Sequence, residues 1–193
     1  MLILLSCAKT MSAVSKIRVP DGTIPRFIAQ ATEIAVQMSQ FSVGELERLL
    51  KVNSKIAVQD YRCFQQFLSD DVASLQALLA YTGIVFKRMN PNGFSAEDFA
   101  YAQEHLRLAS FCYGLLRPLD LIKNYRMEGH ICLPEFGGIT MFDYWKPILT
   151  DAFISEIKSQ GGILVNLASG EMKQLFDWKR WKAKSGSSLL NFR

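Results

Sequence analysis

Two short apolar runs, one near each end of the chain, constrain the fold more than any other feature. The first covers residues 2–5 and is bounded by Ser6 and Lys9, and the second covers residues 163–168 and follows Gly161-Gly162. Apolar residues at consecutive positions over this length are typical of strands that are buried on both faces of a sheet. We therefore expect two central strands that lie far apart in the sequence.

Between these runs, helical patterns outnumber strand patterns. Helical spacing and N-cap residues predict helices over 26–40, from Ser42, over 54–67 and from Ser95. Ser42 with Glu45 forms a capping-box sequence. Residues 81–86 are a further strand candidate that contains a glycine. The sequence predicts a single domain with a mixed α/β fold (α+β), with more helix than strand.

A possible helix-hairpin-helix lies within residues 94–126. The helix that starts at Ser95 is expected to end near Gly114, which suits the left-handed position after a helix. Arg117-Pro118 then predicts a second, short helix. Such a hairpin directs backbone N–H groups at a phosphate, while nearby cations supply charge. The alternative is an αα-hairpin that only packs two helices together.

The positive charge is concentrated at the C-terminal end. The chain has 22 Lys and Arg against 18 Asp and Glu, a net charge of +4. Residues 171–193 hold 6 of the positive and 2 of the negative side chains, so the rest of the chain, with 16 of each, is neutral. The absence of net charge over residues 1–170 does not by itself indicate a polyanionic partner.

Cysteine and histidine spacing argues against a metal site. The four cysteines (Cys7, Cys63, Cys112 and Cys132) form no C-x-x-C pair, and His105 and His130 are isolated from each other. No metal and no cofactor is predicted. The apolar N-terminus lacks the basic start of a signal peptide, and no later run suits a membrane span. We expect a cytoplasmic protein with reduced thiols and no membrane partner.

Three blocks in order along the chain resemble the YaaA family. They are Ser6-Cys7-Ala8-Lys9-Thr10, similar to the family's S-P-A-K-T; residues 98–107 with 113–122 and Tyr125-Arg126; and residues 166–169 with Glu171. The resemblance covers the chain from Met1 to about Trp178. It implies a mixed fold peculiar to the family, a positively charged cleft, a helix-hairpin-helix-like element and binding to double-stranded DNA. It also implies a role in limiting oxidative, iron-linked damage under peroxide stress, and it implies no enzymatic reaction.

The last residues depart from the family pattern. Family members continue through further strands and a basic A-K-K-A-R-G segment, whereas residues 181–193 match nothing in that pattern. We therefore expect one YaaA-like domain over 1–178, shortened or frameshifted at its C-terminus, and a divergent basic tail over 179–193.

Two sets of candidate site residues follow. The set for phosphates of double-stranded DNA, contacted without base reading, is Lys9, Arg107, Gly114, Arg117, Arg126 and Lys173. The set for an alternative function, an enzyme or a binder of a small phosphorylated ligand, lies at the strand ends with Lys9 and comprises Ser6, Thr10, Asn166, Ser169 and Glu171. Polar residues directly after buried strands commonly contact ligands in α/β proteins.

Several of these residues also have a structural interpretation. Arg117 can pair with Asp120 one turn later, and Lys9 can be a solvated loop lysine. Tyr113 and Tyr125 are core residues or stack on exposed bases. Cys7, beside Lys9, is either a peroxide-sensitive thiol of lowered pKa or a buried, inert cysteine.

Overall fold

A five-stranded sheet forms the centre of the molecule. The computed structural model describes residues 1–17 and 19–191, and over these residues it shows this sheet and a two-stranded one. The strand order of the large sheet is β4-β3-β1-β6-β7. Its strands are β1 (Leu2–Ser6), β3 (Leu106–Ser110), β4 (Gly114–Leu116), β6 (Ile163–Asn166) and β7 (Ser188–Asn191). All neighbours pair in parallel except β3 and β4.

The connections between the parallel strands are long and mostly helical, as is usual for parallel pairing. The helices are α1 (Ile28–Ser39), α2 (Val43–Leu50), α3 (Ser54–Gln65), α4 (Ala77–Ala80), α5 (Ile84–Met89), α6 (Ala96–His105), α7 (Met141–Ser159), α8 (Gly170–Lys173) and α9 (Trp178–Ser185). Short 3-10 turns are η1 (Pro91–Gly93) and η2 (Pro134–Phe136), and β2 (Leu75–Gln76) pairs with β5 (Leu121–Ile122).

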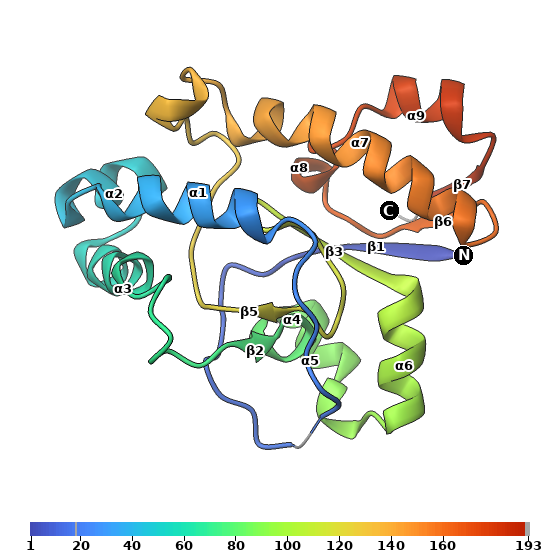
Figure 1. The fold of residues 1–193 in the computed structure, drawn as a ribbon, viewed down its shortest axis with the longest axis horizontal. Helices are drawn as coiled ribbons and strands as arrows, with labels where there is room; N and C mark the ends of the chain where they lie inside the picture. The colour runs from blue at the N-terminus through green and yellow to red at the C-terminus, as the bar shows by residue number, and fades with distance from the viewer. Residues whose placement is uncertain (18, 192–193) are drawn as a thin grey trace.

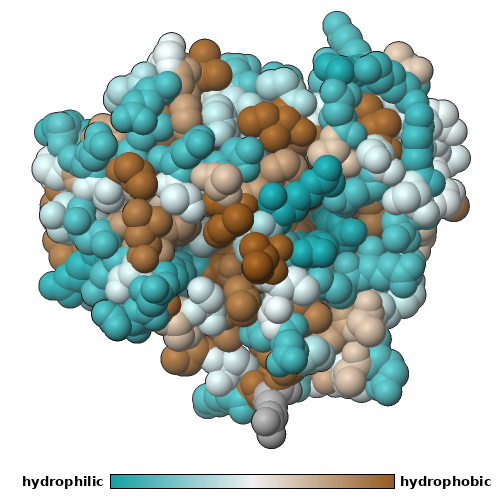
Figure 2. All heavy atoms as spheres, in the orientation of Figure 1, coloured by the Kyte–Doolittle hydropathy of each residue, from teal (hydrophilic) through white to brown (hydrophobic). Residues whose placement is uncertain are grey.

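The helices cover the sheet unevenly. Helices α7 and α9 lie on one side of the large sheet and α6 on the other (Figure 1). Strand β1 runs from the N-terminus toward the side of the molecule where α1, α2 and α3 lie (Figure 1). Figure 2 shows hydrophobic side chains gathered in the middle of the same face, with hydrophilic ones around them. The carboxyl ends of β1 and its neighbours therefore meet the helical half of the molecule.

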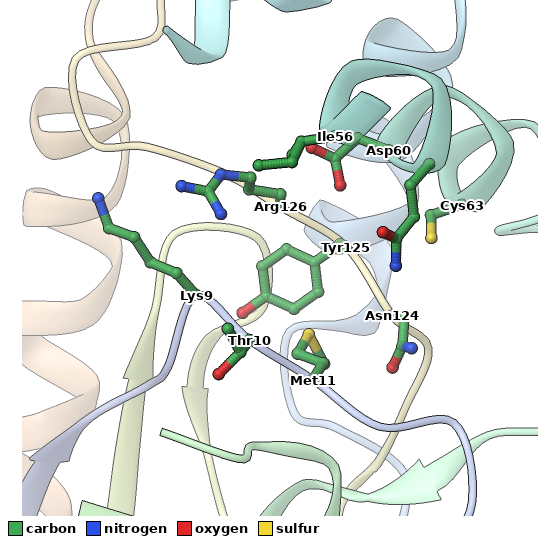
Figure 3. Close-up of a pocket in the computed structure, with 10 residues that line it drawn as sticks. Lys9, Thr10, Met11, Ile56, Asp60, Cys63, Asn124, Tyr125 and Arg126 are labelled. Carbon is green, nitrogen blue, oxygen red and sulfur yellow. The ribbon is translucent and has the colours of Figure 1, made fainter. Parts of the chain in front are cut away.

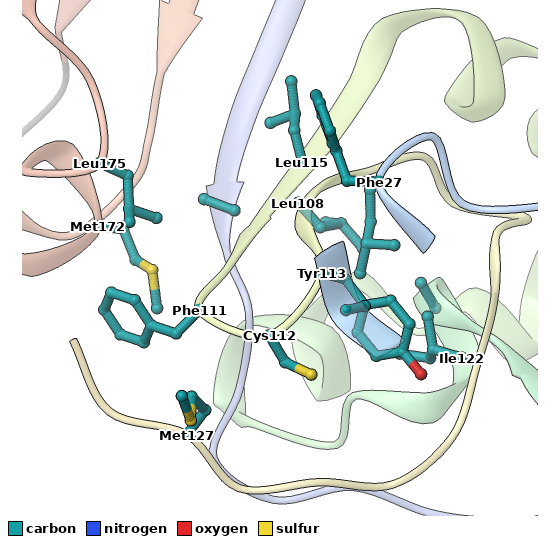
Figure 4. Close-up of a cluster of buried hydrophobic side chains, with 14 of the residues drawn as sticks. Phe27, Leu108, Phe111, Cys112, Tyr113, Leu115, Ile122, Met127, Met172 and Leu175 are labelled. Atoms are coloured by element: carbon teal, nitrogen blue, oxygen red, sulfur yellow. The ribbon is translucent and has the colours of Figure 1, made fainter. Parts of the chain in front are cut away.

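The core joins both halves of the chain. Leu2 and Leu4 of β1 have no exposed surface. Trp145 of α7 is also fully buried, and its indole N–H donates to the carbonyl of Phe111 over 2.8 Å. Figure 4 shows buried side chains from segments far apart in sequence, Phe27, Phe111 and Met172 among them, packed around β1 and β3. Burial of such large side chains contributes about 1.5–3 kcal/mol each.

Several sequence predictions are confirmed. Both apolar runs form adjacent central strands, and the mixed α/β class with more helix than strand holds. Ser42 caps α2 by the predicted box, because its hydroxyl accepts from the Glu45 N–H while the Glu45 carboxylate accepts from the Ser42 N–H over 2.8 Å. Ser95 caps α6 in the same way with Asp98.

The predicted strand over 81–86 is wrong. Gly83 is the N-cap of α5, and the Lys87 N–H donates to the Gly83 carbonyl over 3.0 Å. Phe86 is buried while Ile84 and Val85 are exposed. One buried side chain per turn suits a short surface helix better than a buried strand.

The helix-hairpin-helix is not formed either. Helix α6 ends at His105, all five residues of β3 are buried, and four of them, Leu106–Ala109, pair with β1. The apolar spacing of this stretch suits both structures, and long-range pairing with β1 decides in favour of the strand. Beyond Gly114, the expected second helix is replaced by β4, a turn closed by the Asp120 N–H on the Arg117 carbonyl, and β5.

The C-terminal segment is part of the fold. Residues 178–185 form α9, and β7 extends the sheet beyond β6. The predicted basic tail therefore includes a helix and an edge strand, while Phe192 and Arg193 lie outside the described residues. Over the described part of the chain, none of the helices has the length and apolarity needed to span a membrane.

Substitution of Gly114 by alanine is expected to destabilise the protein by roughly 2–4 kcal/mol. Gly114 has a φ of +70°, and a Cβ there lies 2.8 Å from the Trp145 ring. Backbone strain and steric overlap therefore both lower the stability of the folded state. Gly44→Ala is the matched control, because a Cβ at Gly44 in α2 meets nothing within 4 Å. It is expected to stabilise by up to about 1 kcal/mol. Urea unfolding measures both, and equal effects of the two substitutions contradict this explanation.

Candidate functional site

The carboxyl ends of β1 and β6 are held together by two serines. The backbone N–H of Ser169 donates to the Ser6 hydroxyl over 2.8 Å, and the two hydroxyl oxygens lie 3.2 Å apart. The Ser169 hydroxyl also accepts from the Met172 N–H and caps α8. Ligands of α/β sheets commonly bind outside the carboxyl ends of adjacent strands. This edge is therefore the first place to look for a site.

Two adjoining cavities open at this edge. The serine cavity, of about 80 Å³, is lined by residues that include Ser6, Cys7, Ser169 and Glu171. The Asp60 cavity, of about 190 Å³, lies between α3 and the segment after β1, and its lining includes Thr10, Gln59, Asp60, Cys63 and Asn124. Lys9, Tyr125 and Arg126 line both cavities. We call the two cavities together the strand-end cleft.

One buried carboxylate organises the wall that the cavities share. The side chain of Glu128 is 6% exposed, and its Oε2 accepts from the Lys9 ammonium over 2.7 Å. The other oxygen, Oε1, lies 3.5 Å from Nη2 of Arg126. A buried carboxylate is stable only when it is paired. Glu128 therefore draws together two cations that come from distant parts of the sequence.

Two further polar atoms of the Asp60 cavity lack partners. Among the described residues, Oδ2 of Asp60 and Nε of Arg126 are buried and make no hydrogen bond. Burial raises the pKa of Asp60 to about 6, with Arg126 opposing the rise and Glu128 contributing to it. Figure 3 shows Asp60 and Ile56 of α3 on one side of the cavity, Thr10 and Met11 on the other, and Arg126 between them.

Hydrogen bonds among buried hydroxyl groups hold the side chain of Tyr125 in place. The phenol oxygen of Tyr125 lies 2.6 Å from the hydroxyl oxygens of both Tyr81 and Ser110. Tyr125 is 7% exposed and Tyr113 is 1% exposed. The interpretation of both tyrosines as core residues is therefore confirmed, and Tyr125 forms a rigid surface between the two cavities.

The surroundings of Cys7, which is half-buried, disfavour the thiolate form of its side chain. Burial raises its pKa to about 12, and the carboxylates of Glu171 and Glu128 add to the shift, although a hydrogen bond with Tyr125 opposes it. Lys9 points instead to Glu128. The inert interpretation is therefore favoured over the peroxide-sensitive one, since the thiolate is the reactive form.

The structure brings together only part of the predicted phosphate-binding set. Lys9 and Arg126 meet in the strand-end cleft, but Arg107 is buried, with its Nε donating to Glu156 over 2.6 Å. Arg117 donates to Asp120 over 2.8 Å, which confirms the predicted alternative for this residue. Gly114 lies against Trp145 in the core. Of the five predicted cations, only Lys9 and Arg126 line the cleft.

The strand-end set converges better. Ser6, Thr10, Ser169 and Glu171 line the cleft. Asn166 is buried, and its side-chain oxygen accepts from the Ala168 N–H over 3.1 Å, so it shapes the turn into α8. Lys173 lies at the end of α8 and is not among the cleft-lining residues.

Sequence reasoning missed Glu128 and Asp60. Asp60 lies four residues after Ile56 and four before Phe64, so it shares a face of α3 with two apolar residues, and a charged residue on that face was the available signal. Glu128 had no comparable signal, because its burial arises only when residues 9 and 126 meet. Over residues 1–17 and 19–191, no three His, Cys, Asp or Glu side chains gather as a metal site requires.

Matches to known proteins cover nearly the whole chain. The model of a family described as "Peroxide stress protein YaaA" matches residues 1–189. A UPF0246 protein of Bacteroides thetaiotaomicron is 69% identical over 180 residues, which are 93% of this chain and 70% of the relative. A UPF0246 protein of Bacteroides fragilis is also 69% identical over the same shares. A more distant UPF0246 protein, of Acaryochloris marina, is 38% identical over 89% of this chain and 68% of its own length.

Thiol labelling tests the inert state of Cys7. With a maleimide near neutral pH, Cys132, which is exposed, is expected to react at least about tenfold faster than Cys7 in the folded protein. Buried Cys112 serves as a slow control, and all the thiols react in urea. Mass spectrometry of the digested protein gives the rates. Labelling of Cys7 as fast as Cys132 contradicts this interpretation.

Proposed function

Because this chain belongs to the YaaA family of peroxide stress proteins, we propose that it serves the peroxide response by binding a small phosphate-bearing ligand in the strand-end cleft. The observation that carries the proposal is the meeting of Lys9 and Arg126 at Glu128, on the wall shared by the two cavities. The paired charges are fixed in place before a ligand arrives, so little ordering is required on binding.

Donors remain on both cations after they pair with Glu128. The Lys9 side chain is 55% exposed, and its ammonium has three N–H groups, of which one points at Glu128. Nε of Arg126 is buried without a partner among the described residues. Ammonium and guanidinium donors are the groups that proteins use for phosphate oxygens.

The remainder of the cleft suits a small ligand. The hydroxyls of Ser6 and Ser169 lie on the serine side, and the amides of Gln59 and Asn124 lie on the Asp60 side. Volumes of about 80 and 190 Å³ are below those of sites for drug-sized molecules, and they match a phosphate group with a compact organic part.

A thermal-shift panel of nucleotides and phosphorylated metabolites, each beside its dephosphorylated form, tests the proposal. Only phosphorylated compounds are expected to stabilise the protein. Lys9→Met is expected to weaken the resulting affinity roughly tenfold or more, as loss of a charged hydrogen bond implies. Lys158→Met, at an exposed lysine of α7, is the control and is expected to leave the affinity unchanged.

Lys9→Met also removes a partner of buried Glu128, so its folding is checked by urea unfolding. Lys9→Arg keeps the charge and is expected to retain most of the binding. A ligand that binds Lys9→Met as tightly as the wild type excludes the strand-end cleft as its site.

A second candidate ligand is double-stranded DNA, bound along its phosphates without base reading and thereby protected from oxidative damage. Helix α9 favours it, because Lys179, Lys182 and Lys184 are exposed there. Hydrophilic side chains cover the upper right of the face in Figure 2, where Figure 1 places α9. Lys9 and Arg126 would add less to DNA affinity, since Glu128 already offsets their charge.

Gel-shift titration with a DNA duplex tests this candidate. Binding is expected to weaken steeply between about 50 and 200 mM salt through counterion release. A variant with Lys179, Lys182 and Lys184 replaced by glutamine is expected to bind more weakly and with a smaller salt slope, whereas Lys158→Gln is not. Absence of a shift at low salt, or binding that is indifferent to salt, eliminates DNA as the ligand.

A further inference from the structure

We propose that the Asp60 cavity is a subsite that takes up one oxyanion group together with one proton, with Arg126 and a protonated Asp60 as its two hydrogen-bond donors. The proton comes from solvent and is held by the Asp60 carboxyl, and no covalent bond to the ligand forms. This inference rests on the proposed function. It adds the side of the cleft on which the oxyanion lies and a dependence of binding on pH.

Two side chains that line one cavity each carry a buried polar atom without a hydrogen-bond partner among the described residues. Asp60 is 6% exposed as a residue, and its Oδ2 has no hydrogen-bond partner among the described residues. Nε of Arg126 is also buried without a hydrogen-bond partner among the described residues. Both side chains line the same cavity of about 190 Å³. Buried polar groups in native proteins are almost always paired. A ligand that bonds to both atoms removes two unfavourable burials at once.

Charge balance favours an oxyanion with a proton over an oxyanion alone. With Asp60 ionised, the carboxylates of Asp60 and Glu128 already balance the two cations, Lys9 and Arg126. A further anion next to an ionised Asp60 would add a like charge in a poorly solvated place, which is costly. Protonation of Asp60 removes that repulsion and converts its oxygen from an acceptor into a donor.

The groups that face Asp60 come from three segments. Arg126 and Glu128 lie on the segment between β5 and η2, Lys9 on the segment after β1, and Cys63 one turn later on α3. Burial, followed by the charge of Asp60, raises the pKa of the Cys63 thiol, so it stays protonated at neutral pH. Within this group, the carboxyl of Asp60, with a pKa of about 6, changes its charge near neutrality.

The sign of the pH dependence follows. Below about pH 6, Asp60 already holds its proton. The affinity for the oxyanion is then at its maximum and does not change with pH. Above this pH, each unit costs about tenfold in affinity, because a proton must be taken up on binding. Replacement of Asp60 by asparagine places a permanent N–H donor there without charge. Asp60→Asn is therefore expected to bind with the affinity of the protonated wild type at every pH.

Sulfate is a suitable probe because, unlike phosphate, it does not titrate in this range. Isothermal titration calorimetry of the full chain with sulfate, over about pH 5 to 8, measures the affinity of wild type, Asp60→Asn and Lys9→Met. The expected result is a tenfold loss per pH unit above about pH 6 in the wild type and a flat profile in Asp60→Asn. Urea unfolding at each pH confirms that both variants are folded.

The outcomes separate this inference from the proposed function. If sulfate binding depends on Lys9 but its affinity does not change with pH in the wild type, the inference is overturned and the proposed function still stands. The same pH slope in Asp60→Asn as in the wild type also overturns it, since another group would then take up the proton. Absence of sulfate binding at every pH overturns both.

Discussion

Burial of β1 in the middle of the sheet is the constraint from which the rest of the structure follows. The leucines of β1 are at most 5% exposed, and β3 and β6 pair in parallel with its two edges. Parallel pairing brings the carboxyl ends of all three strands to one edge. The segment after β1 and the turn after β6 therefore meet at Ser6 and Ser169, which creates the strand-end cleft.

The pairing of Glu128 with Lys9 and Arg126 determines which charged groups lie at this edge of the sheet. A carboxylate that is 6% exposed requires partners, and Lys9 and Arg126 supply them. Both cations are thus structural, yet each lines a cavity and retains N–H donors beyond those that Glu128 accepts. The pairing explains why charge counts along the sequence do not reveal the cleft. The cleft contains Lys9 and Arg126 at fixed positions, and the nearby carboxylates of Glu128 and Asp60 offset their charge.

Features set by local sequence could be predicted, and those set by distant contacts could not. The apolar runs and the Ser42 cap act within a few residues, and both were predicted. The stretch after His105 was predicted as helix because its apolar spacing suits helix and strand alike, and only pairing with β1 decides between them. Helix α7 was not predicted, and it contains Pro147 in its interior. In the cleft, Lys9 and Arg126 were predicted, but their buried partners were not.

The central claim is that anions bind where Lys9 and Arg126 meet at Glu128. An NMR titration of the isotope-labelled chain with inorganic phosphate tests it most directly, because backbone amide signals report on every part of the molecule at once. The signals expected to move belong to residues 6–11, 56–63, 124–128 and 169–172. Movement confined to α9, or spread evenly over the surface lysines, would contradict it.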